Sequence, residues 1–137
     1  MGEHVVQLVI PARSEYLLLV RLALAGIARG VPIDDEALSD LKLAVTEACG
    51  NAVAHAYGGD AGTVEVRYVV TRDSISIEVR DEGDRETPIV PTAMPRIDGG
   101  APPESGMGLA IIQAIVDELE IEARDGAGTV VRMRKNL

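Results

Sequence analysis

Three polar side chains recur every four residues in an otherwise apolar segment, LAVTEACGNAVAHAY: Glu47, Asn51 and His55. Residues four apart share one side of an α-helix, so the segment predicts a helix with an acid, an amide and an imidazole in one row. An ordinary solvated face would be filled with Lys, Glu and Gln. Short residues around a few polar groups instead suit the floor of a binding pocket. The alternative is structural, with Glu47 exposed to solvent and Asn51 a hydrogen-bonded amide of the core.

Two further segments carry residues that suit a flat, amine-bearing ring and an anion. The segment RDEGD ends a predicted strand with Asp81, which can accept a hydrogen bond from an exocyclic amine. Gly83 follows and lets a flat ring approach the backbone. The segment SGMG places Gly106 and Gly108 directly before a predicted helix, where backbone N–H groups and the helix dipole favour negative charge. Each segment also has an ordinary explanation, as a strand-end turn and as a helix start.

The hydrophobic pattern predicts the elements that must position these residues, in the order β-α-α-β-β-loop-α-β-β. The expected strands are residues 4–11, 63–70, 74–81, 119–124 and 129–135, and the expected helices are residues 14–30, 35–57 and 108–118. Ser14 is the expected N-cap of the first helix, and Asp34 or Asp35 that of the second. Hairpin connections imply a mostly antiparallel, mixed sheet with three helices on one face, an α/β (α+β) two-layer sandwich.

The second predicted helix has an apolar stripe besides its polar row. On a helical wheel Leu41, Val45, Ala48 and Ala52 fall together, so we expect this side to face the sheet. Cys49 is the single cysteine and has no partner thiol or His cluster at metal-ligand spacing. We therefore expect a buried, unreactive thiol.

Residues 82–105 interrupt the regular pattern with five of the seven prolines of the chain. A loop of this length inside a compact domain is usually a functional lid or a disordered insertion. The segment alone favours neither.

Composition limits the classes of partner. The formal net charge is −9 and aromatic residues make up 2% of the chain, so its surface repels nucleic-acid phosphate and offers little for base stacking. No apolar run approaches the roughly 20 residues that span a bilayer, and no signal-peptide pattern follows Met1. We expect a cytoplasmic protein that contacts neither nucleic acid nor membrane directly.

In combination, and in this order, the acid-x-x-x-Asn helix, the Asp-x-Gly strand end, the long loop and the Gly-x-Gly helix start resemble the GHKL ATPase superfamily, the fold of histidine kinases and gyrase-type topoisomerases. Within it, the chain is most similar to the bacterial anti-sigma-factor serine/threonine kinases. The resemblance covers nearly the whole chain. It is carried by ARSE, TEACGNAVAHAY, VRDEG and SGMGLAII, and by Gly128-Thr129 near the end.

The resemblance implies one Bergerat-type ATP-binding domain over residues 1–137, with a lid at about residues 82–105. Asp81 would read the adenine amine, Gly83 would pack near the ring, and Thr129 would assist through its hydroxyl or a water.

The phosphate end of the nucleotide would meet the polar row of the second helix. The resemblance implies Glu47 as the catalytic base and Asn51 as a ligand of Mg²⁺, a hard cation that suits oxygen ligands. The remaining implied nucleotide contacts are His55, Ser105, Gly106, Met107, Gly108 and Leu109. A structural hydrogen bond at the helix end is the alternative role for His55.

The family phosphorylates a serine or threonine of an anti-anti-sigma protein and sequesters a sigma factor, and the resemblance implies the same partners here. A homodimer is also expected, because residues 16–28 are apolar around more of the helix than one sheet-facing stripe requires. This surface fits a dimer or partner interface, and deep burial within the monomer is the alternative. Two further alternatives are an ATP-binding module without phosphotransfer and a kinase for a different regulatory protein. The first is favoured by Arg85, which stands where the superfamily often has a second glycine. Arg85 and Arg96 are the lid residues that could reach the γ-phosphate.

Overall fold

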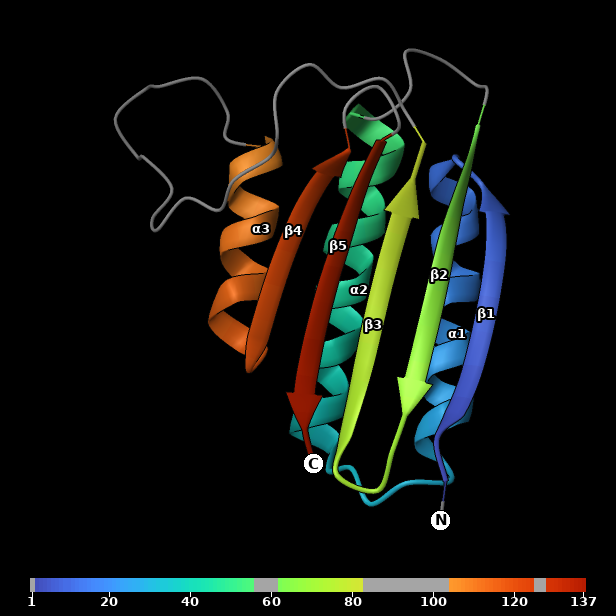
Figure 1. The fold of residues 1–137 in the computed structure, drawn as a ribbon, viewed down its shortest axis with the longest axis vertical. Coiled ribbons are helices and arrows are strands. Elements are labelled where there is room, and N and C mark those ends of the chain that lie inside the picture. The colour runs from blue at the N-terminus through green and yellow to red at the C-terminus, as the bar shows by residue number, and fades with distance from the viewer. Residues whose placement is uncertain (1, 56–61, 83–103, 125–127) are drawn as a thin grey trace.

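The computed structural model describes residues 2–55, 62–82, 104–124 and 128–137 of the chain. The strands are β1 (His4–Pro11), β2 (Thr63–Val70), β3 (Ser74–Asp81), β4 (Glu118–Arg124) and β5 (Gly128–Asn136), and the helices are α1 (Leu17–Ala28), α2 (Asp35–His55) and α3 (Glu104–Ile115). All three helices lie on the same face of one sheet (Figure 1). The predicted two-layer α/β sandwich is confirmed.

The sheet has the strand order β1-β2-β3-β5-β4, and each of its pairings among the described strands is antiparallel. β5 lies between β3 and β4, so the chain leaves β3, forms α3 and the edge strand β4, and returns to the centre. This return places the first residues of β5 directly against the last residues of β3, with Thr129 opposite Asp81.

The core lies between the sheet and the helices. Alternate residues of β2 and β3 are buried, which is the period expected for strands with one covered face. The predicted stripe of α2 is confirmed, since Leu41, Val45, Ala48 and Ala52 are all at most 3% exposed. Tyr68 on β2 donates a hydrogen bond of 2.7 Å from its hydroxyl to the Val20 carbonyl, which fastens α1 to the sheet.

Of the three helix starts, only that of α2 is set by a capping residue expected from the sequence. Asp34 caps α2 as expected, because its carboxylate accepts a hydrogen bond of 2.7 Å from the backbone N–H of Ala37. Ser14 is not a cap; it begins a 3-10 turn, Ser14–Tyr16, that precedes α1. The structure begins α3 at Glu104, four residues before the expected Gly108, because glycine is tolerated inside a helix that packing stabilises.

The expected end of α3 at residue 118 is also wrong. Lys135 on β5 donates a hydrogen bond of 2.8 Å to the carbonyl of Ile115, and the backbone N–H of Asp117 bonds to Arg134. These contacts end the helix at Ile115 and start β4 at Glu118. Hydrogen-bond partners on β5 therefore set the end of α3, which the sequence of the helix itself does not mark.

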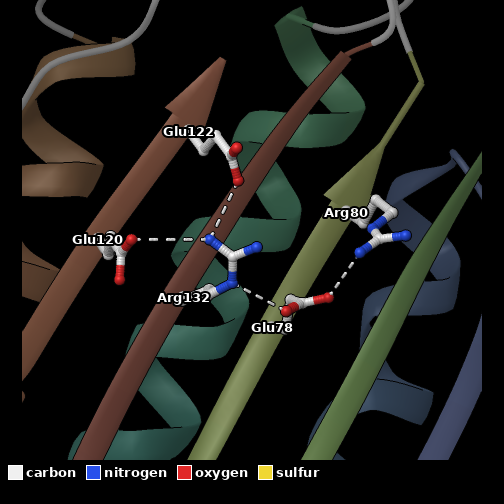
Figure 2. A network of polar contacts seen from close by, with 5 residues as sticks. All are labelled: Glu78, Arg80, Glu120, Glu122 and Arg132. Carbon is white, nitrogen blue, oxygen red and sulfur yellow. Dashed lines mark hydrogen bonds and ion pairs between the residues drawn. The ribbon is translucent and has the colours of Figure 1, made fainter. Parts of the chain in front are cut away.

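Charged side chains cover the face of the sheet that carries no helices. Figure 2 shows Arg132 of β5 between acids of both neighbouring strands. Its guanidinium lies 3.0 Å from Glu78 on β3 and 3.2 Å from Glu122 on β4, and Arg80 pairs with Glu78 at 3.0 Å. These bonds, with that to Glu78 the largest cause, raise the pKa of Arg132. Each exposed pair contributes about 0–1 kcal/mol, so the network mainly favours the register of β3, β5 and β4.

Within the described part of the chain, no helix combines the length and apolarity needed to cross a bilayer.

Candidate functional site

Four chain segments that carry predicted site residues meet at one end of the molecule. β3 and α2 end there, while β5 and α3 begin there, at the upper end of Figure 1. The antiparallel return of β5 brings its start beside the end of β3, and α3 begins at the end of the sheet where α2 finishes. Residues far apart in the sequence therefore share one neighbourhood.

The helical half of this site is a close contact between α2 and α3. A Cβ atom built on Gly108 would lie 3.0 Å from Oε2 of Glu47 and 3.2 Å from Nδ2 of Asn51. Both side chains of α2 thus lie against the backbone of α3 at Gly108, and any larger residue at position 108 would displace them. Asn51 is 7% exposed, and Glu47 is half-buried. The row predicted from the four-residue spacing is confirmed for these two residues.

The sheet half of the site pairs Asp81 with Thr129. They lie opposite each other on β3 and β5 and are 4% and 2% exposed. Gly128, at the start of β5, allows the backbones of β3 and β5 to approach closely at this end of the sheet. Its φ is +98°, and a Cβ atom at this position would lie 1.9 Å from the carbonyl oxygen of Asp81. Only glycine fits both the backbone conformation and the space. In the sequence Gly128 stands out as a motif residue, and a glycine that closes a turn before a strand is also a signal for this structural role.

Two polar atoms of the site are buried without a hydrogen-bond partner among the described residues: Nδ2 of Asn51 and Oγ1 of Thr129. Leaving such a group unpaired costs about 1–3 kcal/mol. Buried unpaired groups in a native protein call for an explanation, and a bound polar ligand would supply one. The only other such atom in the described chain, Nε of Arg80, lies on the opposite face of the sheet.

The remaining predicted residues are placed less completely. His55 is the last residue of α2, and Ser105, Gly106 and Met107 lie in the first turn of α3, but the side chains of these residues are outside the description. Gly83 and the lid residues Arg85 and Arg96 also lie outside the described residues.

The earlier start of α3 changes the roles of two predicted residues. The backbone N–H groups without an intrahelical partner belong to the turn that begins at Glu104, so Gly108 lies beyond them. Gly108 also provides the close approach to Glu47 and Asn51. Leu109 has 0% exposure and its side chain belongs to the core, while the nucleotide contacts of both residues stay predictions.

Other reactive groups lie away from this site. The expected burial of the Cys49 thiol is confirmed, and this burial raises its pKa to about 12, which disfavours the reactive thiolate. Burial, with Cys49 nearby, also raises the pKa of Tyr68.

Two surface hollows contain none of the predicted residues. One of about 320 Å³ lies on the open sheet face beside Arg67, Ser76 and Arg134. The other, of about 360 Å³, lies between α1 and α2.

Comparison with known proteins identifies relatives over nearly the whole chain. The family described as "Histidine kinase-like ATPase domain" matches residues 10–135. The serine-protein kinase RsbW of Bacillus pumilus (strain SAFR-032) is 38% identical, over 96% of this chain and 85% of its own length. The anti-sigma F factor of Caldanaerobacter subterraneus subsp. tengcongensis is 34% identical, over 90% of this chain and 87% of its own length.

Two solved structures share the fold. The RsbU and RsbW domains of a Mycobacterium tuberculosis protein match with a TM-score of 0.71 and 21% identity, over 96% of this chain and 31% of that one. The mycobacterial sensor histidine kinase MprB matches with a TM-score of 0.53 and 20% identity, over 98% of this chain and 97% of that one.

Proposed function

The chain belongs to the histidine kinase-like ATPase family, and we propose that it is an anti-sigma factor with protein serine/threonine kinase activity. It transfers the γ-phosphate of ATP to a serine or threonine of an anti-anti-sigma protein. It also sequesters a sigma factor, for which the anti-anti-sigma protein competes, and phosphorylation releases that competitor. The output is a change in transcription.

The observation that carries the catalytic assignment is the contact of Glu47 and Asn51 with Gly108. The glycine leaves no side chain between α3 and the carboxylate, since a Cβ atom at position 108 would lie 3.0 Å from Oε2 of Glu47. An acid and an amide with an unpaired nitrogen are thereby held beside the helix whose first turn offers N–H groups to phosphate. This is the arrangement that phosphoryl transfer needs, since its catalysis is mainly positioning and charge neutralisation.

Glu47 is the proposed catalytic base. Its carboxylate orients the acceptor hydroxyl and takes the proton as the acceptor oxygen bonds to the γ-phosphorus. The bond between that phosphorus and the bridging oxygen breaks, and ADP leaves.

Asn51 is the proposed protein ligand of Mg²⁺. Its amide oxygen suits a hard cation, and ions of this kind in nucleotide sites take most of their ligands from phosphates and water. Within the described chain no group of three or more His, Cys, Asp or Glu residues is arranged for a metal, so the ion would be held together with ATP. Bound there, it offsets phosphate charge in a protein of net charge −9.

Asp81 and Thr129 form the proposed adenine end of the site. Both are buried on the helix-covered face of the sheet, and the Thr129 hydroxyl has a hydrogen bond still to make. The Asp81 carboxylate accepts a hydrogen bond from the exocyclic amine, which guanine lacks at that position. Gly83, His55 and residues 105–107 complete the proposed nucleotide contacts.

We place the protein in the cytoplasm as a homodimer. β1 is an edge strand without a Lys, Arg, Asp or Glu residue, and Val5 and Val9 on its uncovered side are 44% and 61% exposed. Natural edge strands usually carry charges that prevent pairing. A second copy would bury these valines, which a Val9→Lys variant measured by light scattering would test.

The proposed function is tested by transfer of label from γ-labelled ATP to the anti-anti-sigma protein of the same genome. Glu47→Gln should abolish transfer and retain ATP binding by calorimetry, whereas Asn51→Ala should weaken both. Glu36→Gln, which removes an exposed acid from the first turn of α2, is the matched control and should transfer normally. Normal transfer by Glu47→Gln would show that another group is the base.

The second candidate function is an ATP-binding module that switches its partners without phosphotransfer, which Arg85 at the second motif position favours. In that case the wild-type protein binds Mg-ATP and a sigma factor but transfers no label. Transfer to a protein outside the sigma pathway would instead indicate a kinase for a different regulatory protein.

A further inference from the structure

Lys135 of β5 lies on the helix-covered face of the sheet, two residues after the buried Met133. Its ammonium group donates a hydrogen bond of 2.8 Å to the carbonyl of Ile115, the last residue of α3. The same group lies 3.6 Å from the carboxylate of Asp40 on α2, and the Lys135 side chain is 19% exposed. One cation on a strand therefore ties the end of α3 to α2.

The cation supplies what the end of α3 lacks. The last four carbonyl groups of a helix have no intrahelical partner, and the negative end of the helix dipole favours a positive charge. α3 carries no basic residue in its own last turn, so the charge comes from β5. A lysine ammonium has three donors, which lets it serve the Ile115 carbonyl and the Asp40 carboxylate together.

This bridge and the contact at the proposed active site share one register between α2 and α3. α2 runs toward the site end of the molecule and α3 runs away from it (Figure 1). Asp40 precedes Glu47 by seven residues, and Ile115 follows Gly108 by seven residues. Seven residues are almost two helical turns, about 10 Å along the axis, so both levels lie on the same sides of the two helices.

Apolar packing between these two levels leaves the axial position of α3 poorly defined. Ala44 on α2 and Ile112 on α3 lie between the two levels, are fully buried and belong to the hydrophobic core. Apolar attraction is non-directional, and Ala44 presents only a methyl group. A hydrogen bond has a preferred geometry, and polar groups in packed helices are a known way to specify register. The bridge is therefore suited to set where α3 lies along α2.

We propose that Lys135 is a positioning residue for phosphoryl transfer. It fixes α3 along α2 so that the bare backbone at Gly108 meets the side chains of Glu47 and Asn51. This rests on the proposed function, because the position of α3 matters for turnover only if Glu47 is the catalytic base. Without the bridge α3 shifts along α2, and the Glu47 carboxylate loses the surface that holds it.

The test is Lys135→Met, which keeps a long side chain and removes the ammonium, assayed by label transfer at saturating Mg-ATP and varied acceptor. A 1 Å misplacement of a catalytic group costs about 100-fold, so a shift of about 0.5 Å should lower kcat about tenfold. The acceptor KM should stay within about twofold. Lys135→Arg retains the charge and the donors, and should restore kcat to within about threefold of the wild type.

Asp40→Asn breaks the bridge at its α2 end and leaves Lys135 on the Ile115 carbonyl. It should lower kcat in the same direction, because α3 is then no longer tied to α2. Should Lys135→Met lower the unfolding temperature, this milder variant provides the same comparison in a folded protein.

The matched control is Arg134→Met, at the neighbouring position of β5. Its guanidinium pairs with Glu118 on the opposite face of the sheet, so the variant removes a paired cation from the same strand without touching the helices. It should leave kcat within about twofold of the wild type.

The position of α3 is also read without turnover, from the NMR resonances of the Asn51 side-chain amide, whose nitrogen would lie 3.2 Å from a Cβ atom at position 108. These resonances are assigned by their absence in Asn51→Ala. They should shift in Lys135→Met and stay in place in Arg134→Met, with each protein fully folded at the temperature of measurement.

The outcomes separate this proposal from the function on which it rests. A wild-type protein that transfers no label refutes the kinase assignment, and the catalytic role of Lys135 falls with it. Transfer by the wild type with an unchanged kcat in both Lys135→Met and Asp40→Asn overturns the positioning role alone. A fall in kcat that Arg134→Met shares, or one without a shift of the Asn51 resonances, overturns it also, because the loss would then not pass through the contact at Gly108.

Discussion

Replacing Gly108 by alanine should separate activity from stability. Inside a helix, alanine is favoured over glycine by about 0.8–1 kcal/mol. The new methyl group, however, would lie 3.0 Å from Oε2 of Glu47 and 3.2 Å from Nδ2 of Asn51, closer than a relaxed contact. The half-buried Glu47 side chain can retreat, so we expect a free energy of unfolding within about 1 kcal/mol of the wild type.

The new methyl group should instead lower the catalytic rate. Relieving the contact requires the carboxylate to move by about 0.4 Å, and a 1 Å misplacement of a catalytic group costs about 100-fold. We therefore expect kcat to fall about 5- to 10-fold in the Gly108→Ala variant, or roughly 1–1.4 kcal/mol in the activation barrier.

The assay is label transfer to the acceptor at saturating Mg-ATP, beside a thermal unfolding curve of the same preparation. Gly26→Ala is the matched control, because a Cβ at position 26 of α1 meets nothing within 4 Å. It should gain stability and keep full activity. Wild-type kcat in Gly108→Ala would refute the reasoning, since Glu47 would then not depend on the bare backbone of α3.

Three further outcomes are expected. Asp34→Ala should lower the free energy of unfolding by about 1 kcal/mol with activity retained, because α2 loses its cap; urea unfolding that matches the wild type would contradict this. Gly128→Ala should weaken ATP binding and reduce the preference for ATP over GTP, because it pushes β5 away from Asp81; calorimetry with both nucleotides tests it, and Gly26→Ala serves as control. The raised pKa of Cys49 means that the folded state holds its proton longer than the unfolded state, so stability is lost as pH rises from about 9 towards 12. Cys49→Ala should reduce that loss in urea unfolding at each pH, and an unchanged alkaline slope would show that the thiol does not contribute.

Much of the architecture was readable from the sequence, because periodicity and capping are local. The alternation of Ile75, Ile77 and Val79 with polar residues marks β3 in the sequence and in the structure alike. Asp34 caps the helix that it was expected to cap, since the carboxylate and the N–H it binds are only three residues apart. Element boundaries that depend on residues distant in the sequence could not be predicted in this way. The end of α3 is an example, because Lys135 of β5 bonds to the carbonyl of Ile115.

For the site, the sequence by itself determined the residue types and their order: an acid and an amide one turn apart, an aspartate at a strand end, and glycines near the start of an apolar helix. The tertiary structure decided which of them meet. Gly108 serves as the surface against which Glu47 and Asn51 lie, and Gly128 closes the ladder at Asp81. The physical reason is that spacing along a helix or strand follows from backbone geometry, whereas a contact between α2 and α3 depends on how both pack on the sheet.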